Sequence, residues 1–200
     1  HTKLANKIII ATTTNNNDDL IVDWCKKNDV NFFRGSENNV YDRVLKTHQK
    51  FNTSIIVELT GDCILITAEL IDYAIKLYME NEYDYVNVRD PAGMSAQVYS
   101  LKILESVKHG RELEYLDKEH VTPYLRTSGK YKIHITKIYK DLDFPEVVYD
   151  LDTKEDLEVL DKIFKNFDNF NFSFKDIAEF FKKNPDIANI NKHTRRKGLS

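Results

Sequence analysis

The chain has few residues of the types that build disulfide scaffolds, low-complexity linkers or membrane spans. It has two cysteines in 200 residues, Cys25 and Cys63, and their spacing fits neither a disulfide framework nor a zinc site. We therefore expect a reducing, cytoplasmic setting. Six glycines and four prolines exclude a low-complexity or collagen-like chain. Apolar runs are a few residues long, so the sequence predicts no transmembrane helix.

The chain also lacks an excess of charge of either sign. Its 29 Lys and Arg residues and 32 Asp and Glu residues leave a net charge of -3, so we expect no nucleic-acid partner. A content of 42% hydrophobic and 12% aromatic residues is sufficient for a packed core at this length. We predict one domain over residues 1–183 and a polar, basic tail over residues 184–200.

Strands and helices alternate in the first half of the sequence. The hydrophobic pattern predicts strands at 7–13, 30–33, 54–60 and 84–88, and helices at 18–27, 38–51 and 67–79. This alternation is typical of parallel βαβ units with right-handed crossovers. In the less regular second half, strands are predicted at 97–99, 131–138 and 147–151, and helices at 101–107, around 119–125, and after Thr153 and Ser173. We expect an α/β fold.

Two aspartates directly follow predicted strands. Asp62 comes after the strand at 54–60, and Asp152 comes after the strand at 147–151. Ligands of open α/β sheets bind outside the carboxyl ends of the strands, and carboxylate oxygens are preferred ligands of Mg²⁺. We therefore predict that Asp62 and Asp152 meet and hold Mg²⁺ or Mn²⁺ against nucleotide phosphates. Asp150 is a reserve ligand, and a turn or helix cap is the alternative role for either aspartate.

Six short segments occur in one order along the chain. They are IIIATT (8–13), FRGS (33–36), VYDR (40–43), LTGDC (59–63), EHVTPY (119–124) and LDTKEDL (151–157). In this order they resemble the cytidylyltransferase superfamily that includes the spore-coat polysaccharide protein F group. Its relatives are the 3-deoxy-manno-octulosonate and N-acylneuraminate cytidylyltransferases. The resemblance covers about residues 1–165, with a weaker echo in the tail.

The resemblance implies a three-layer α/β/α fold with a GT-A-like or Rossmann-like mixed, mostly parallel sheet. It implies transfer of CMP from CTP to a small anionic acceptor, a sugar acid, phosphate or phosphonate, with release of pyrophosphate in polysaccharide biosynthesis. The aspartates matching Asp62 and Asp152 hold the metal in this family. A homodimer is expected as well.

The resemblance also assigns residues to the two substrates. The nucleotide side is expected to comprise Thr12, Arg34, Gly35, Ser36, Asp42 and Arg43. The acceptor side is expected to comprise Gly93, Ser95, Gln97, Glu119 and His120.

The sequence departs from the family pattern in three places. The phosphate-binding strand–loop–helix unit that opens such enzymes has no match, so we expect a fragment with little activity of its own. Ser95 and Gln97 stand where the polysaccharide group usually has two acids, which indicates an acceptor side with less negative charge. Ile64 stands where proline is usual. The alternatives are a GT-A-like glycosyltransferase with Asp150 and Asp152 as an Asp-x-Asp motif, and a degenerate, non-catalytic domain.

Overall fold

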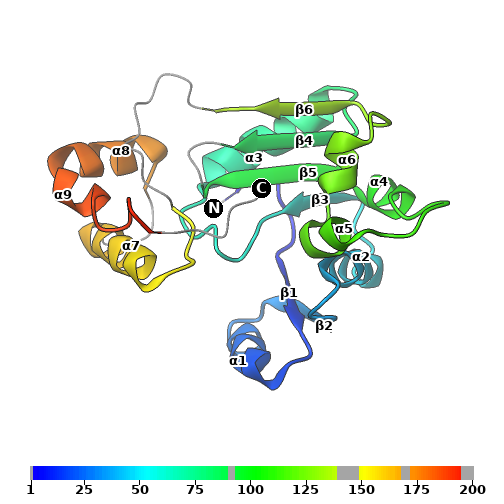
Figure 1. The fold of residues 1–200 in the computed structure, drawn as a ribbon, viewed down its shortest axis with the longest axis horizontal. Helices are drawn as coiled ribbons and strands as arrows, with labels where there is room; N and C mark the ends of the chain where they lie inside the picture. Colours follow the sequence, from blue (N-terminus) through cyan, green and yellow to red (C-terminus); the bar gives the residue numbers. More distant parts are fainter. Residues whose placement is uncertain (1, 90–92, 139–148, 168–171, 195–200) are drawn as a thin grey trace.

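The structure is a computed structural model that describes residues 2–89, 93–138, 149–167 and 172–194. Its strands form two sheets (Figure 1). The small sheet pairs β1 (Ile9–Thr13) with β2 (Asn31–Gly35) in parallel. The larger sheet has the order β3 (Ile55–Glu58), β5 (Ser95–Ser100), β4 (Tyr85–Arg89) and β6 (Ile133–Thr136).

Strand directions in the larger sheet confirm the predicted mixed, mostly parallel arrangement. β5 runs antiparallel to both β3 and β4, and β4 runs parallel to β6. The strands β3, β4 and β6 therefore share one direction, with β5 reversed between β3 and β4. The reversal arises because β4 and β5 follow each other closely in the chain, and antiparallel neighbours need no crossover helix.

Helices connect most of these strands. They are η1 (Asn16–Asp18), a 3₁₀ turn, then α1 (Asp19–Lys27), α2 (Val40–Lys50), α3 (Ala68–Glu80), α4 (Leu101–Ser106), α5 (Tyr115–His120), α6 (Pro123–Thr127), α7 (Lys154–Asn166), α8 (Phe174–Lys183) and α9 (Pro185–Ala188). A capping box starts α7, because Thr153 and Asp156 exchange side-chain to backbone hydrogen bonds. Such caps stabilise a helix start by roughly 0.5–2 kcal/mol. Among the described helices, none is long and apolar enough to cross a membrane.

Helices cover both faces of the larger sheet, which gives the expected α/β/α layers. On one face, Leu70 and Ala74 of α3 are buried in a core with Val86 and Val98 of the sheet. On the other face, the side chains from α2 and α4 pack against the sheet. That second core contains Tyr41, Leu45, Ile56, Tyr85, Tyr99 and Leu104. The two faces thus differ in character, because the second one carries tyrosines.

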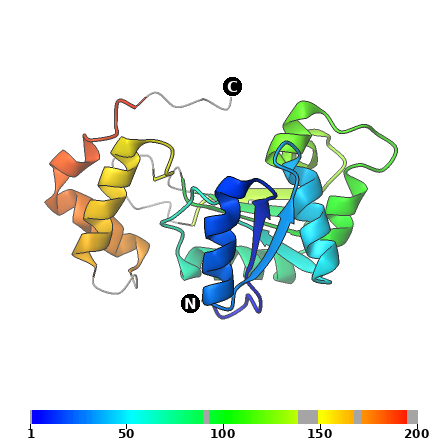
Figure 2. The ribbon, with the colours of Figure 1, turned by 90° about the horizontal axis from the view of Figure 1, so that it is seen from below.

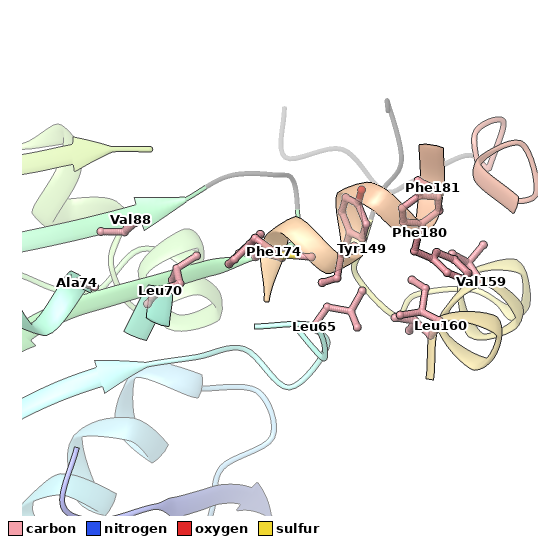
Figure 3. Close-up of a cluster of buried hydrophobic side chains, with 14 of the residues drawn as sticks. Leu65, Leu70, Ala74, Val88, Tyr149, Val159, Leu160, Phe174, Phe180 and Phe181 are labelled. Carbon is pink, nitrogen blue, oxygen red and sulfur yellow. The ribbon is translucent and has the colours of Figure 1, made fainter. Parts of the chain in front are cut away.

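The helices α7, α8 and α9 gather at one end of the molecule (yellow to red in Figure 2), and α2, α4, α5 and α6 lie toward the other. The first core extends into this helical group. In Figure 3, Phe174 of α8 lies between Leu70 of α3 and the aromatic side chains of Tyr149 and Phe181. Each fully buried side chain of this size contributes about 1.5–3 kcal/mol. The core therefore holds the stretch that contains Tyr149 next to the sheet.

Three expectations differ from the structure. The single helix expected around 119–125 is two helices, because Val121 between them has a φ of 64°. Of the strand expected at 147–151, residues 147–148 lie outside the described residues, and 149–151 are not a strand. Part of the expected polar tail is folded: it contains α9, and the side-chain amide of Asn191, which is 1% exposed, donates to buried Asp156 at 2.8 Å.

Candidate active site

Three segments far apart in the sequence meet beyond the end of β3. They are the turn at 61–63, the loop at 93–94 and the stretch at 149–151. The backbone N–H of Leu151 donates to the carbonyl oxygen of Asp62 at 3.1 Å. Gly93 has a φ of +87°, and a Cβ there would lie 2.5 Å from the backbone nitrogen of Asp150. Only glycine fits this approach without strain, and the approach sets Asp150 beside Asp62.

The side chains of Asp62, Cys63 and Asp150 form one cluster. One ligand atom from each lies within 4.8 Å of the others. The sulfur of Cys63 lies 3.0 Å from the hydroxyl oxygen of Thr60 and 3.7 Å from Oδ1 of Asp150, to which it donates. Burial raises the pKa of the Cys63 thiol to about 11, and the two carboxylates add to the rise. The thiol is therefore protonated at neutral pH and acts as a donor toward Asp150.

One oxygen atom of the cluster lacks a hydrogen-bond donor in the described part of the chain. Oδ1 of Asp62 is buried and has no hydrogen-bond partner among the described residues. A buried carboxylate oxygen without a donor is costly, and a cation removes that cost. Oxygen atoms of Asp62 and Asp150 are the hard ligands that Mg²⁺ and Mn²⁺ take. The residues present therefore fit a divalent cation.

Asp152 lies outside this cluster. Its side chain is exposed where α7 begins, and its backbone N–H donates to Oδ2 of Asp156 at 3.1 Å. The structure therefore groups the reserve candidate Asp150 with Asp62 in place of Asp152. The predicted metal role of Asp152 stays a prediction.

The ends of β1 and β2 carry the expected nucleotide-side residues. Thr12 donates from its hydroxyl to Oδ2 of Asp18 at 2.7 Å, and both the N–H and the hydroxyl of Thr13 donate to the same oxygen. These hydrogen bonds lower the pKa of Asp18 to about 2. The carboxylate of Asp18 therefore holds the loop after β1 against the end of that strand.

Arg34 holds that same loop. Its Nε donates to the carbonyl of Thr13 at 2.8 Å, its Nη1 to Asp19 at 2.6 Å and its Nη2 to the carbonyl of Asn15 at 2.7 Å. Each nitrogen of the guanidinium group is therefore engaged by the protein. In this arrangement Arg34 shapes the loop, and its expected contact with a nucleotide stays a prediction.

Arg43 supports the turn after β2. Its Nη1 donates to the carbonyl of Ser36 at 2.6 Å. A Cβ on Gly35 would lie 2.9 Å from Cγ of Arg43, so glycine leaves room for the arginine stem. The Nε of Arg43 is buried without a partner among the described residues. Asp42 pairs instead with Lys46 at 2.7 Å on the surface of α2.

Comparison with known proteins gives consistent results. Residues 1–187 match the protein family described as Cytidylyltransferase. The chain belongs to the cytidylyltransferase family. Family membership confirms the resemblance noted in the sequence. The reaction class of this family is nucleotidyl transfer. The assignment rests on a match over most of the chain.

Individual relatives span nearly the whole chain. The uncharacterized protein MJ1063 of Methanocaldococcus jannaschii is 33% identical over 198 residues, which cover 98% of this chain and 81% of that protein. The spore coat polysaccharide biosynthesis protein SpsF of Bacillus subtilis is 29% identical over 191 residues, covering 94% of this chain and 80% of that protein. A cytidylyltransferase structure from Leptospira borgpetersenii is 30% identical with a TM-score of 0.86, and the match covers 98% and 83% of the two chains.

The structure brings some of the expected acceptor-side residues of this cytidylyltransferase family member together. Gly93 lies against Asp150, as described above. Gln97 of β5 accepts a hydrogen bond from the hydroxyl of Thr122 at 2.7 Å, which places β5 against the link between α5 and α6. Glu119 and His120 lie at the end of α5, with Oε2 of Glu119 3.8 Å from Nε2 of His120. Ser95 is half-buried at the start of β5.

Sequence reasoning missed a group of polar residues on the larger sheet. They are Glu58 of β3, Asn87 of β4 and, above the sheet, Thr122 and Arg126. One signal was present: Glu58 interrupts the apolar run of β3, and Asn87 interrupts that of β4. A polar residue inside a buried strand requires a partner or a function.

Proposed function

We propose that this protein transfers CMP from CTP to a small anionic acceptor and releases pyrophosphate. Family membership supports the reaction class, and the name of SpsF supports a role in polysaccharide synthesis. The observation that carries the proposal for this chain is the buried Oδ1 of Asp62, which lies beside Asp150 and has no hydrogen-bond partner within the described ranges. Carboxylate oxygens that lie close together are ligands that a cation bound to a triphosphate takes.

Asp62 and Asp150 would hold Mg²⁺ or Mn²⁺ in this proposal. The bound cation would neutralise negative charge on the phosphates where the new bond forms. The chain's own contribution is positional: Leu151 and Gly93 fix the spacing of the two carboxylates, and the thiol of Cys63 orients Asp150. Groups that are already held in position lower the activation barrier, because less entropy is lost when the reactants come together.

The turn at Ser36 would receive the nucleotide. Arg43 holds this turn, and its buried Nε keeps one donor unused among the described residues. We expect the cytosine base or ribose to approach there, because the family resemblance places Arg34, Gly35 and Ser36 on the nucleotide side. A homodimer belongs to the same proposal, and sedimentation would test it.

Calorimetric titration of CTP, with UTP as the competing nucleotide, tests the proposal. We expect binding that requires Mg²⁺, favours CTP and is lost in Asp62→Asn. Asp161→Asn is the matched control, because Asp161 forms an exposed pair with Lys165 on α7 and should leave binding unchanged. Equal binding of both nucleotides, or binding that survives Asp62→Asn, would overturn it. Release of a nucleoside diphosphate from a nucleotide sugar would favour the glycosyltransferase alternative.

A further inference from the structure

Cys63 brings a sulfur atom into the group formed by the carboxylates of Asp62 and Asp150. Within the described ranges, one oxygen of each aspartate and the sulfur of Cys63 all lie within 4.8 Å of one another. In the proposed function the thiol orients Asp150 and does nothing else. Sulfur is also a strong ligand of several divalent cations, so the surroundings of this atom bear on a second role.

The turn at 61–63 brings neighbouring side chains to the same place. Successive residues of a strand project to opposite faces, so Asp62 and Cys63 would diverge in extended backbone. Here the N–H of Cys63 donates to the carbonyl of Thr60 at 3.2 Å, and the N–H of Ile64 donates to the carbonyl of Asp62 at 3.0 Å. These two hydrogen bonds tighten the backbone around Cys63, and the convergence of the two side chains follows from the turn.

The separation between Cys63 and Asp150 suits two ligands of one cation. Sγ of Cys63 lies 3.7 Å from Oδ1 of Asp150. A tetrahedral cation with bonds of about 2.3 Å to sulfur and about 2.1 Å to oxygen holds these atoms roughly 3.6 Å apart. A cation therefore fits between them with little movement of either side chain. While no cation is bound, the same contact serves as a weak S–H···O hydrogen bond.

Two hydrogen-bond donors contact the sulfur. Oγ1 of Thr60 lies 3.0 Å from it, and the backbone N–H of Ser95 donates to it. Both contacts favour the negatively charged thiolate, which is the form that binds metals. A cysteine that served as a small apolar side chain would need neither donor. The sulfur is thus held by an outer shell of the kind that orients metal ligands.

The carboxylates give a cation access to the buried sulfur. Cys63 is 8% exposed, whereas Asp62 and Asp150 are half-buried and reach solvent. Zinc takes four ligands, and sites in which it meets a substrate have three from the protein. Two carboxylates and a thiolate supply three, which leaves one position for water or a phosphate oxygen. Thiolate ligands favour Zn²⁺ over Mg²⁺, which takes oxygen ligands in octahedral geometry.

We propose that Cys63, Asp62 and Asp150 together bind a thiophilic divalent cation such as Zn²⁺, with the sulfur of Cys63 as a direct ligand. When the cation binds, the thiol proton passes to solvent, and bonds to the cation replace the contact between Cys63 and Asp150. Cys63 is then the residue that sets which cation the site prefers. The inference rests on the proposed function for the view that this cation faces a nucleotide.

Titration with Co²⁺ in the absence of nucleotide tests for the sulfur ligand directly. Cobalt bound to a thiolate has a near-ultraviolet charge-transfer absorption that oxygen and nitrogen ligands do not produce. Cys25→Ala leaves Cys63 as the only cysteine, so any such band in this variant belongs to Cys63. We expect the band in the wild type and in Cys25→Ala, complete at one Co²⁺ per chain, and no band in Cys63→Ala.

A comparison of two cations separates a ligand from a residue that only packs the turn. Cys63→Ala should weaken Zn²⁺ binding in calorimetry at least about tenfold, because disturbing even an outer-shell partner of a metal has such an effect. Mn²⁺ binding, followed by electron paramagnetic resonance, should change by less than about threefold, because Mn²⁺ is held by the oxygen ligands. Cys25→Ala is the matched control and should change neither.

Two results would overturn the inference. One is the absence of a charge-transfer band in Cys25→Ala, which decides the question even if Cys63→Ala fails to fold. The other is a parallel loss of Zn²⁺ and Mn²⁺ binding in Cys63→Ala, which is the result expected when the thiol only supports the turn.

CTP titration of the same samples separates this inference from the proposed function. A cobalt band without CTP binding refutes the proposed reaction and supports the sulfur-containing site. CTP binding that requires Mg²⁺, without a cobalt band, refutes the sulfur ligand alone.

Discussion

The backbone N–H of Leu151 lies 3.1 Å from the carbonyl oxygen of Asp62, and this single main-chain hydrogen bond joins the turn after β3 to the stretch before α7. Because the bond involves no side chain, it survives substitution of either carboxylate. The spacing of Asp62 and Asp150 is therefore a property of the backbone. Changes in the charge of either residue can be read as changes in ligand binding, without a change in the scaffold.

Asp62→Asn should separate stability from metal binding. The amide nitrogen of asparagine can donate to Asp150, so we expect the metal-free protein to gain up to about 1 kcal/mol of unfolding free energy. Thermal unfolding with Mn²⁺ and CTP should show a rise in Tm for the wild type and none for the variant. Asp150→Asn should likewise lose the rise.

Asp152→Asn tests whether Asp150 or Asp152 is the metal ligand beside Asp62. Asp152 is exposed and outside the cluster, so its substitution should leave most of the rise in Tm. If Asp152→Asn removes the rise and Asp150→Asn does not, the pairing expected from the sequence is right and the grouping with Asp150 has no functional meaning.

Gly93→Ala should lower the free energy of unfolding by more than the positive φ of residue 93 alone explains. The new Cβ would overlap backbone atoms at Tyr149 and Asp150, which cannot rotate away. We expect a loss of roughly 2–4 kcal/mol in unfolding free energy, from backbone strain and overlap together. Gly110→Ala is the matched control, because Gly110 has a φ of +72° and open space around it.

Denaturant unfolding measures both glycine variants. Gly110→Ala should lose only about 1 kcal/mol, the cost of the backbone conformation. Gly93→Ala should in addition weaken the effect of Mn²⁺ on Tm, since it displaces Asp150. Equal losses in the two variants would show that the close approach at Gly93 does not constrain the site.

Local sequence signals were enough to predict the elements around the site. The hydrophobic pattern predicts a strand at 54–60, and the observed β3 is Ile55–Glu58. Asp62, the aspartate predicted after this strand, lies in the cluster with Asp150. The structure groups Asp62 with Asp150, two residues before the predicted Asp152, and this grouping depends on a main-chain contact between distant segments. Hydrophobic periodicity cannot report such a contact.

Two further features could not be read from local pattern. The break between α5 and α6 falls at Val121, a β-branched residue whose propensity argues against a positive φ. Glu58, Gln97 and Asn87 lie opposite one another only because β5 pairs in antiparallel register with both β3 and β4. Register is set by pairing over the whole sheet, so Glu58 and Asn87 looked unrelated in the sequence.

Arg43→Lys should loosen the turn after β2. Lysine keeps the charge, but it lacks the planar group that reaches the carbonyl of Ser36. We expect a loss of about 1 kcal/mol in stability, together with weaker CTP binding in calorimetry. Arg89→Lys, at an exposed position on β4, is the control and should change neither. Unchanged CTP binding by Arg43→Lys would remove Arg43 from the nucleotide side.

The pH dependence of stability should reflect two buried groups that act in opposite directions. Burial lowers the pKa of His48 from 6.5 to about 4, so the folded protein resists protonation and stability falls as the pH drops from 6.5 to 4. Burial raises the pKa of Glu58 from 4.5 to about 7, so the folded protein retains a proton and stability falls as the pH rises from 4.5 to 7. Each effect amounts to about 1–3 kcal/mol for a half-buried group.

Between about pH 4.5 and 6.5 the contributions of His48 and Glu58 therefore cancel, and removal of one should reveal the other. In Glu58→Gln, the unfolding free energy should rise with pH across this window, because only the His48 contribution remains. In His48→Gln it should fall with pH, because only Glu58 remains. Denaturant titrations at half-unit pH steps would measure both slopes. Parallel curves for the two variants would show that neither group has the pKa shift that its burial implies.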